Sequence, residues 1–242
     1  MAGGRLLWLS GLGLMLGYLL WGMPASSAIQ THSSGATQIP LTAVAIDGRE
    51  VLTGYRIGRY PPQEQWPDAY RPLQYLYRVS EAEQETPLSP SFVVRQFLCK
   101  QESGWPKYLW VEPKLLGTLE RILAFLKAQG VELQTLTIMS GYRTPWYNQS
   151  LGNGERSRHI YGDAADLFVD VDGDGQMDDL NKDGRVDIGD AQWLVALINS
   201  QFGSTRDGFL GGLSAYPATP YHGPFVHIDL RGTVARWGAH QP

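Results

Sequence analysis

The chain has 242 residues, a net charge of −4 and 43% hydrophobic residues, so it can form a folded domain with a sizeable core. It has no basic stretch with interleaved aromatic residues, and we therefore expect no nucleic-acid partner. The single cysteine, Cys99, excludes an internal disulfide and a site of several thiolates, and we expect it to be a small buried residue.

The first 28 residues have the layout of a secretory signal. Arg5 precedes an apolar run from Leu6 to Trp21, and small residues end the segment at Ala28. The apolar run is shorter than the ~20 residues that cross a bilayer, so we expect cleavage after Ala28, with an uncleaved anchor as the alternative. No later segment is apolar enough to span a membrane. We expect the mature chain to be exported to the periplasm or cell envelope, or secreted, without an integral membrane domain.

Residues 29–87 are interpreted as a flexible leader followed by a small β-rich unit. The leader is rich in Ser, Thr, Gly and Gln. Two runs, Leu41–Ile46 and Leu73–Tyr77, then have the composition of strands and flank turns that contain Gly and Pro. A charged stretch and two prolines follow, so we place a domain boundary at residue 87.

The second domain, residues 88–242, is predicted to mix helices and strands. Pro113 begins a helix that Gly130 ends, and its apolar residues recur at helical spacing. The segment Thr135–Met139 alternates like a half-buried strand and leads into a polar loop, a favoured place for a site. We expect an α+β fold in which a small antiparallel sheet with flanking helices surrounds a metal site.

The segment from Ser157 to Asp166 holds the first candidate metal ligands. His159 and Asp166 offer a nitrogen and an oxygen donor seven positions apart, and the residues between them are small. A hydrolytic zinc site has three protein ligands and one open position. The third candidate, His227, lies on a predicted strand that alternates as Phe225, His227 and Asp229, while His222 precedes this strand.

These residues resemble the zinc D-Ala-D-Ala carboxypeptidase family, which is grouped with lysostaphin-type peptidases and the hedgehog signalling domain. The chain matches the pattern Ser-x-His-x-x-Gly-x-Ala-x-Asp from Ser157 to Asp166 without a mismatch. It also carries the second histidine cluster, with His227 in the ligand position, and the upstream Ser-Gly-Tyr-Arg loop, with Arg143. The resemblance covers roughly residues 88–237.

The resemblance implies a catalytic zinc ion held by His159, Asp166 and His227. It further implies that His222 acts beside the reaction centre and that Arg143 serves catalysis and grips a carboxylate or carbonyl oxygen of the substrate. We expect Ser157 to bind substrate at the rim. The nearby aromatic residues are candidates for an apolar wall, although such residues are more often part of the core: Tyr142, Trp146 and Tyr147.

One departure from the family pattern concerns the surroundings of the zinc ligands. Family members often carry a histidine two residues before the last ligand, where this chain has Phe225. Asp229 is the residue expected to take part of the supporting role. The position three residues before His227, where another branch has a catalytic glutamate, is Pro224.

The acidity of the chain is concentrated between Asp170 and Asp190, a stretch that contains eight aspartates and only two basic residues, Lys182 and Arg185. This stretch alone has a net charge of −6. Because the whole chain has a net charge of −4, the remaining residues together carry +2. Its second half, from Asp179 to Asp190, has the spacing of a twelve-residue calcium loop, and the final aspartate resembles the loops of dockerin modules. The loop lies within an insertion at about 170–199. The expected ligands are Asp179, Asn181, Asp183, Arg185 through its carbonyl, Asp187 and Asp190.

A second, truncated calcium site is possible upstream, because the start of the same spacing occurs twice. Its candidate ligands are Asp170, Asp172, Asp174, Gln176 and Asp178. The two frames overlap, so two complete helix-loop-helix sites cannot form. The alternative for the whole stretch is a solvated acidic loop.

We expect a monomeric zinc D,D-peptidase that cuts peptidoglycan stem peptides or cross-links, with structural calcium. Two alternatives stay open. The first is a wall peptidase of the same fold that cuts another bond, such as L-Ala-D-Glu. The second is a zinc- and calcium-stabilised binding module without turnover, against which the presence of both His222 and Arg143 argues.

Overall fold

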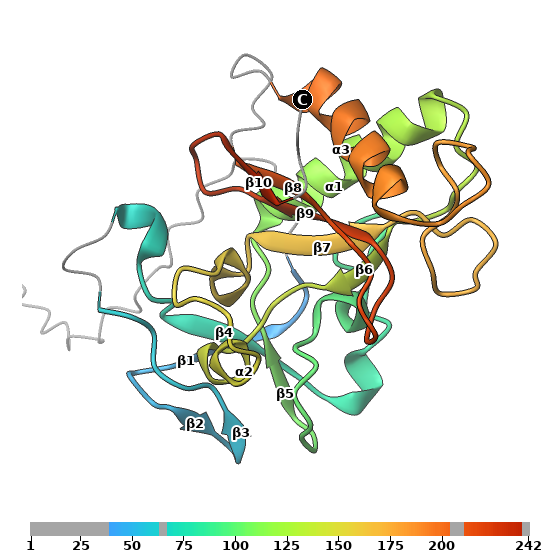
Figure 1. The fold of residues 1–242 in the computed structure, drawn as a ribbon. Helices are drawn as coiled ribbons and strands as arrows, with labels where there is room; N and C mark the ends of the chain where they lie inside the picture. Colours follow the sequence, from blue (N-terminus) through green and yellow to red (C-terminus); the bar gives the residue numbers. More distant parts are fainter. Residues whose placement is uncertain (1–38, 63–66, 204–210, 239–242) are drawn as a thin grey trace, which may run out of the picture. The chain divides into compact units, whose positions relative to one another are not determined.

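The computed structural model describes residues 39–62, 67–203 and 211–238 (Figure 1). The predicted signal peptide and the predicted leader up to residue 38 lie outside these residues. The described part combines α-helices with small sheets, which confirms the predicted α+β class. None of its helices is both long enough and apolar enough to cross a membrane.

A five-stranded sheet lies at the centre of the second half of the chain. Its spatial order is β10-β8-β9-β7-β6. The strands are β6 (Thr137–Ser140), β7 (Ala164–Phe168), β8 (Gly212–Tyr216), β9 (Phe225–Asp229) and β10 (Ala235–Gly238). Neighbouring strands are antiparallel, except that β10 runs parallel to β8. The sequence predicted an antiparallel sheet, but one pair of strands is parallel. The chain reverses direction after β9 and then passes to the far side of β8, so β10 runs in the same direction as β8.

Two helices cover one side of this sheet. Helix α3 (Ile188–Phe202) packs against β8 and β9. Helix α1 (Pro113–Ala128) contacts α3 through Phe125, whose ring centroid lies 5.7 Å from that of Phe202. The strand residues that face α3 alternate with those of the other face and are fully buried, such as Leu213, Val226 and Ile228. The opposite face of the sheet is left for polar side chains.

The sequence of α1 accounts for its bounds and orientation. Pro113 occupies the first turn, where its missing N–H needs no partner, and Gly130 follows the helix with a φ of 85° that favours glycine. The apolar residues at helical spacing all lie in the core: Leu115, Leu116, Leu119, Ile122, Leu123 and Leu126. The predicted helix is confirmed. The strand predicted at 135–139 is present as β6, which begins two residues later and ends one residue later.

A second sheet joins the predicted β-rich unit to the residues after it. It has the order β1-β4-β5 and consists of β1 (Thr42–Ala45), β4 (Tyr75–Val79) and β5 (Lys107–Leu109). Tyr77 of β4 is paired with Leu109 of β5, so the sheet crosses the boundary that the sequence placed at residue 87. A hairpin of β2 (Val51–Leu52) and β3 (Tyr55–Arg56) precedes β4. One hydrophobic core contains residues from both sides of residue 87.

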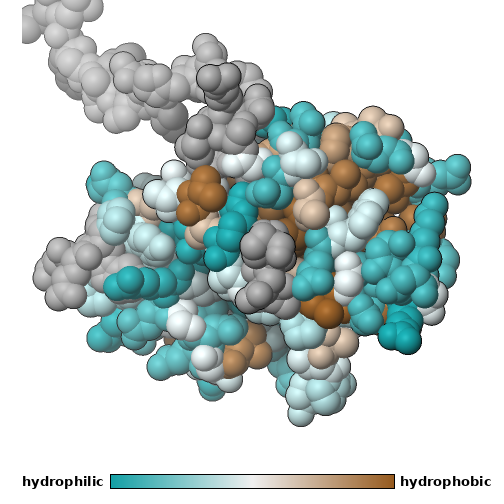
Figure 2. All heavy atoms as spheres, turned by 45° about the horizontal axis from the view of Figure 1, so that its top comes forward, coloured by the Kyte–Doolittle hydropathy of each residue, from teal (hydrophilic) through white to brown (hydrophobic). Residues whose placement is uncertain are grey.

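Short helices complete the described chain. They are the 3-10 helices η2 (Asp68–Tyr70), η3 (Glu81–Glu83), η4 (Val94–Phe97) and η5 (Arg158–Tyr161), and the α-helix α2 (Pro145–Ser150). Cys99 is buried and is a free cysteine, as predicted. Hydrophobic side chains appear between larger hydrophilic areas on the face shown in Figure 2. Most large apolar side chains of the described part lie in the core, and Tyr221, with 94% exposure, is a clear exception.

Candidate active site

Polar side chains cross the open face of the central sheet in one row. Strand pairing places Ser140 opposite Asp166, Asp166 opposite His227, and His227 opposite Ser214. Directly paired residues of adjacent strands lie on the same face of a sheet. The register of three strands therefore brings together Asp166 and His227, which are 61 residues apart in the sequence.

Donor atoms of His159, Asp166 and His227 meet at this row. His159 Nε2 lies 3.2 Å from Asp166 Oδ1 and 3.2 Å from His227 Nδ1, and His227 Nδ1 lies 2.8 Å from Asp166 Oδ1. All three residues are buried. Zinc–ligand distances of about 2.0–2.2 Å put tetrahedral ligand atoms about 3.3–3.6 Å apart. The donor types and spacing therefore fit a zinc ion after small adjustments.

The orientation of His159 is fixed by its second ring nitrogen. Nδ1 lies 2.7 Å from the backbone oxygen of Gly141 and donates its hydrogen there, so that Nε2 remains free to bind a metal. Gly141 is required at this point, since a Cβ atom would lie 2.7 Å from the Cα atom of Phe97. The Ser-Gly-Tyr-Arg loop thus holds the first ligand through its glycine as well as carrying Arg143.

A buried ion pair holds the turn between the first two ligands. The Arg158 guanidinium donates to both carboxylate oxygens of Asp163, with 2.9 Å between Nε and Oδ1, and also to the backbone oxygen of Ala69. The guanidinium carbon of Arg158 also lies 4.8 Å from the centre of the Tyr70 ring and 4.7 Å from the centre of the Tyr161 ring. The variable positions of the ten-residue pattern therefore anchor His159 and Asp166. The sequence analysis did not identify this pair.

Replacing Arg158 by Ala is expected to lower the free energy of unfolding by about 3–5 kcal/mol, because the buried Asp163 loses its partner. Urea unfolding with and without the substitution measures the change. The matched control is Arg71→Ala, which breaks an exposed pair with Asp68 and should cost less than about 1 kcal/mol. Equal effects of the two substitutions would contradict the structural role of Arg158.

Gly162 allows this turn to close. It follows η5 with a φ of 69°, and a Cβ atom would lie 2.6 Å from the backbone oxygen of Trp110. Both the positive φ and the close approach require glycine. The glycine of the family pattern is thereby explained by backbone geometry rather than by contact with a ligand.

Asp229 supports the third ligand. Its Oδ2 lies 3.1 Å from His227 Nε2, the ring nitrogen that faces away from the ligand cluster. The fully buried Asp229 carboxylate also accepts from Gly212 N at 2.9 Å and from Arg231 Nε at 2.9 Å. Asp229 thus contacts His227 as the sequence predicted, although Phe225 replaces the histidine found in many family members. The sequence analysis missed Arg231.

Electrostatics favour a charged carboxylate at the centre of the cluster. Burial alone would raise the pKa of Asp166, but His159 and His227 hold it well below its usual range. Burial lowers the pKa of His159 despite its contact with Asp166. Burial opposes the charged form of His227 too, yet hydrogen bonds with Asp166 and Asp229 raise its pKa to about 9. The two histidines therefore differ in protonation at neutral pH in the metal-free protein.

Arg143 contacts a proposed metal ligand directly. Its Nη2 donates to Asp166 Oδ2, the oxygen not shared with the histidines, and its Nε donates to Ser140 Oγ at 2.8 Å. Its backbone N donates to His159 O at 3.1 Å. Arg143 therefore orients Asp166, a role that the sequence analysis did not assign to it.

The cluster opens into a cavity of about 970 Å³. Arg143, Ser157 and His222 line it together with the three candidate ligands, so the structure brings all six predicted zinc-site and substrate-site residues into one cavity. The half-buried His222 donates from Nδ1 to the backbone oxygen of Gly223 at 2.8 Å, which leaves Nε2 available. Its ring lies 5.0 Å from that of Phe225, nearly at a right angle.

The three aromatic candidates for an apolar wall do not line this cavity. Tyr142 is buried, with 1% exposure, and its hydroxyl lies 3.3 Å from that of Tyr60. Trp146 and Tyr147 line a neighbouring cavity instead. Aromatic residues near the predicted ligands come instead from the C-terminal strands, for which the sequence predicted no apolar wall. They are Tyr216, Phe225 and Trp237.

The acidic segment forms two turns with similar internal hydrogen bonding. Asp179 accepts from the backbone N of Asp183 and Gly184, at 3.1 and 2.8 Å. Asp170 likewise accepts from Gly173 and Gly175, at 2.7 and 3.1 Å. The predicted position-nine and position-twelve ligands of the second loop, Asp187 and Asp190, also form the capping box at the start of α3. In the first turn, ligand oxygens of Asp170, Asp172 and Asp174 lie within 4.8 Å of one another.

A family model described as Peptidase M15 matches residues 90–186. The match confirms the resemblance to the zinc D-Ala-D-Ala carboxypeptidase family and supports a metallopeptidase. It includes Arg143, Ser157, His159 and Asp166, whereas His222 and His227 lie beyond its end. A search of curated proteins found no match.

Proposed function

We propose that this protein is a zinc-dependent D,D-peptidase that hydrolyses stem peptides or cross-links of peptidoglycan, as a carboxypeptidase or an endopeptidase. The observation that carries the proposal is the meeting of His159 Nε2, Asp166 Oδ1 and His227 Nδ1 in one cavity. The Peptidase M15 match supports a hydrolytic use of this donor set.

His159, Asp166 and His227 would hold the zinc ion. A zinc ion with three protein ligands supplies an activated nucleophile at neutral pH and polarises a carbonyl group. The protein keeps these ligands in place through the contacts of their far sides: Gly141 with His159, Asp229 with His227 and Arg143 with Asp166. Such supporting contacts tune ligand basicity and metal affinity.

The remaining cavity residues would act on the substrate. His222, whose Nε2 is available, would transfer a proton to or from the scissile bond or donate to the developing oxyanion. Arg143 uses Nε and Nη2 on protein oxygens, so its Nη1 is the group suited to a substrate carboxylate or carbonyl oxygen. Ser157, half-buried at the start of η5, would hydrogen-bond the substrate at the rim.

Incubation of the zinc-loaded protein with purified muropeptides, followed by mass spectrometry, tests the proposal. Loss of a terminal D-alanine indicates a carboxypeptidase, and opening of cross-linked dimers indicates an endopeptidase. Release at another bond, such as L-Ala-D-Glu, would replace the D,D assignment with the alternative wall peptidase. Intact muropeptides at full zinc occupancy would favour a binding module and reject the enzymatic proposal.

We also infer that the protein acts outside the cytoplasm, since peptidoglycan lies there and residues 1–28 have the sequence layout of a signal. Fractionation of producing cells, with N-terminal sequencing of the mature chain, tests this inference. Full-length protein confined to the cytoplasm would contradict it.

We propose, in addition, that the acidic segment binds calcium through Asp179, Asn181, Asp183, the carbonyl of Arg185, Asp187 and Asp190. Its carboxylates gather despite mutual repulsion. Partial burial raises the pKa of Asp178, and the negative charges of Asp172, Asp170 and Asp174 raise it further. Oxygen-rich acidic sites of this kind suit calcium rather than zinc. The first turn ends on Asp178, which accepts from Val171 N at 2.8 Å, and would form a shorter site.

Calcium is expected to raise the stability of the protein by about 2.7 kcal/mol at a hundredfold excess over its dissociation constant. A calcium-selective chelator should lower the melting temperature without removing zinc. The double substitution Asp179→Ala and Asp183→Ala should abolish this response, whereas the control Asp68→Ala should keep it. An unchanged melting temperature with and without millimolar calcium would leave the segment as a solvated acidic loop.

A further inference from the structure

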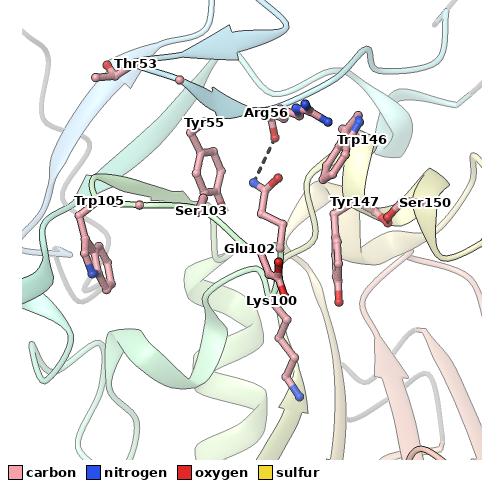
Figure 3. A pocket seen from close by; sticks show the side chains of 13 residues that line it. Thr53, Tyr55, Arg56, Lys100, Glu102, Ser103, Trp105, Trp146, Tyr147 and Ser150 are labelled. Carbon is pink, nitrogen blue, oxygen red and sulfur yellow. Dashed lines mark hydrogen bonds between the residues drawn. The ribbon is translucent and has the colours of Figure 1, made fainter.

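A second cavity lies beside the active site and has no part in the function proposed above (Figure 3). Its volume is about 730 Å³. Three segments form its wall: the β2–β3 hairpin at Thr53–Arg56, the loop Lys100–Trp105, and one side of α2 with Trp146 and Tyr147. The hairpin belongs to the N-terminal β-rich segment, to which no sequence pattern assigns a function.

The cavity continues toward the active site at Lys100. This residue also lines a smaller cavity of about 290 Å³, together with Met139, Tyr221 and His222, which in turn line the active-site cavity. In Figure 3 the side chains of Lys100 and Tyr147 extend toward the same end of the pocket, away from Arg56. Lys100 thus lies between the second cavity and the smaller cavity that borders the active site.

The charges of the active site reach this junction. Burial lowers the pKa of Lys100, the positive charge of Arg143 lowers it further, and Asp166 opposes this change. Burial likewise raises the pKa of Tyr147, which Arg143 partly offsets. Both side chains therefore lie within electrostatic range of the residue that contacts the proposed zinc ligand Asp166.

The wall of the cavity combines cations with aromatic rings. Arg56 and Lys100 outnumber Glu102, so the charged residues of the wall carry a net positive charge. The Arg56 guanidinium lies 4.8 Å from the centre of the Trp146 ring, and its backbone oxygen accepts from Gln101 Nε2 at 3.1 Å. Gln101 is buried, with 2% exposure. These contacts hold an exposed cation in a defined place beside an apolar surface.

We propose that this cavity binds the carboxylate-bearing part of an acidic peptide whose scissile bond lies at the zinc site. The proposal rests on the proposed function, because it extends the same substrate away from the bond that is cut. Lys100 would pair with a carboxylate next to the active site, Arg56 with a more distant one, and Trp146 and Tyr147 would contact the chain between them. Two separated cations favour an acidic peptide over an uncharged glycan, for which stacking surfaces alone would suffice.

Binding of a matched pair of probes tests the proposal. The first probe is a stem-peptide analogue with a non-hydrolysable bond in place of the scissile amide and a free D-glutamate carboxylate. The second is the same analogue with that carboxylate amidated. Calorimetry on the full zinc-loaded chain should show about tenfold tighter binding of the free acid, the effect of one hydrogen bond to a charged group.

Lys100→Gln or Arg56→Gln should remove most of the preference for the free acid. Each substitution deletes one candidate partner of the probe's carboxylate and keeps a side chain that can form hydrogen bonds. Lys114→Gln, on the exposed side of α1, changes charge equally and should keep it. Equal affinities of wild-type protein for the two probes would overturn the proposal. So would a preference that survives both cavity substitutions, or tighter binding of a peptide-free glycan fragment that Trp146→Ala abolishes.

The outcomes also separate this proposal from the proposed function. A preference for the acid that depends on Lys100 or Arg56, without cleavage of any muropeptide, would keep the acidic-peptide site and reject the peptidase. Cleavage of muropeptides without any preference between the probes would keep the peptidase and reject the acidic-peptide site.

Discussion

Asp166→Ala is expected to abolish zinc binding and to lower turnover by at least about 10³-fold, which corresponds to about 4 kcal/mol of lost transition-state stabilisation. Asp166 is the most connected residue of the cluster, since Oδ1 contacts both histidines and Oδ2 accepts from Arg143. Its removal deletes the only anionic ligand and leaves the partly buried Arg143 guanidinium without its carboxylate partner. Zinc content per chain, measured by elemental mass spectrometry, checks the prediction together with muropeptide turnover.

His159→Ala and His227→Ala should lose zinc as well, and Asp68→Ala, which removes an exposed carboxylate paired with Arg71, should keep it. Normal zinc content in all three ligand variants would remove the site assignment altogether. The elevated pKa of His227, about 9, adds a second check. His227 must lose this proton to bind zinc, so zinc binding at pH 7 should release about one proton per zinc, and zinc affinity should rise with pH up to about 9.

The sequence was sufficient to predict those residues of the site that local structure holds in place. His159 and Asp166 lie in one short pattern, in which Gly162 must adopt a positive φ and fit against Trp110. His227 could be added because strict alternation along β9 puts it on a polar face. The amphipathic α1 was predictable for the same reason, since its apolar residues repeat at helical spacing.

The sequence could not predict features that depend on contacts between distant segments. The pairing of β4 with β5 joins the β-rich segment to later residues, and no local pattern specifies which strand is the partner. Arg158 and Asp163 occupy variable positions of the pattern, so only their burial against Tyr70 and Tyr161 shows their role. The contact between Arg143 and Asp166 could not be predicted either, because the two residues are 23 positions apart in the sequence.

This contact with Asp166 changes what substitution of Arg143 should do. If Arg143 only gripped the substrate, Arg143→Ala would leave zinc affinity unchanged. Because Nη2 donates to Asp166 Oδ2, we instead expect Arg143→Ala to weaken zinc binding about 10-fold or more, the range typical of contacts that orient metal ligands. Arg143→Lys should recover part of the affinity, since it restores the charge without the paired geometry.

His222→Ala is expected to lower kcat by about 10²-fold or more while zinc content and melting temperature stay close to the wild-type values. His222 shares the active-site cavity with the ligands, but its hydrogen bond is to the backbone oxygen of Gly223 and not to any of them. Removing it therefore leaves the cluster intact and deletes only a group suited to proton transfer or oxyanion contact. An effect on kcat and kcat/KM in equal measure would indicate an interaction made in the transition state.

His222→Gln separates the two roles of this side chain. Gln can donate a hydrogen bond to an oxyanion but cannot exchange protons near neutral pH, so partial recovery of kcat relative to His222→Ala would indicate oxyanion stabilisation. No recovery, together with loss of one limb of the pH–rate profile, would indicate acid–base catalysis. Wild-type turnover in both variants at full zinc occupancy would exclude His222 from the mechanism, and reduced zinc content would mean that it supports the metal site instead.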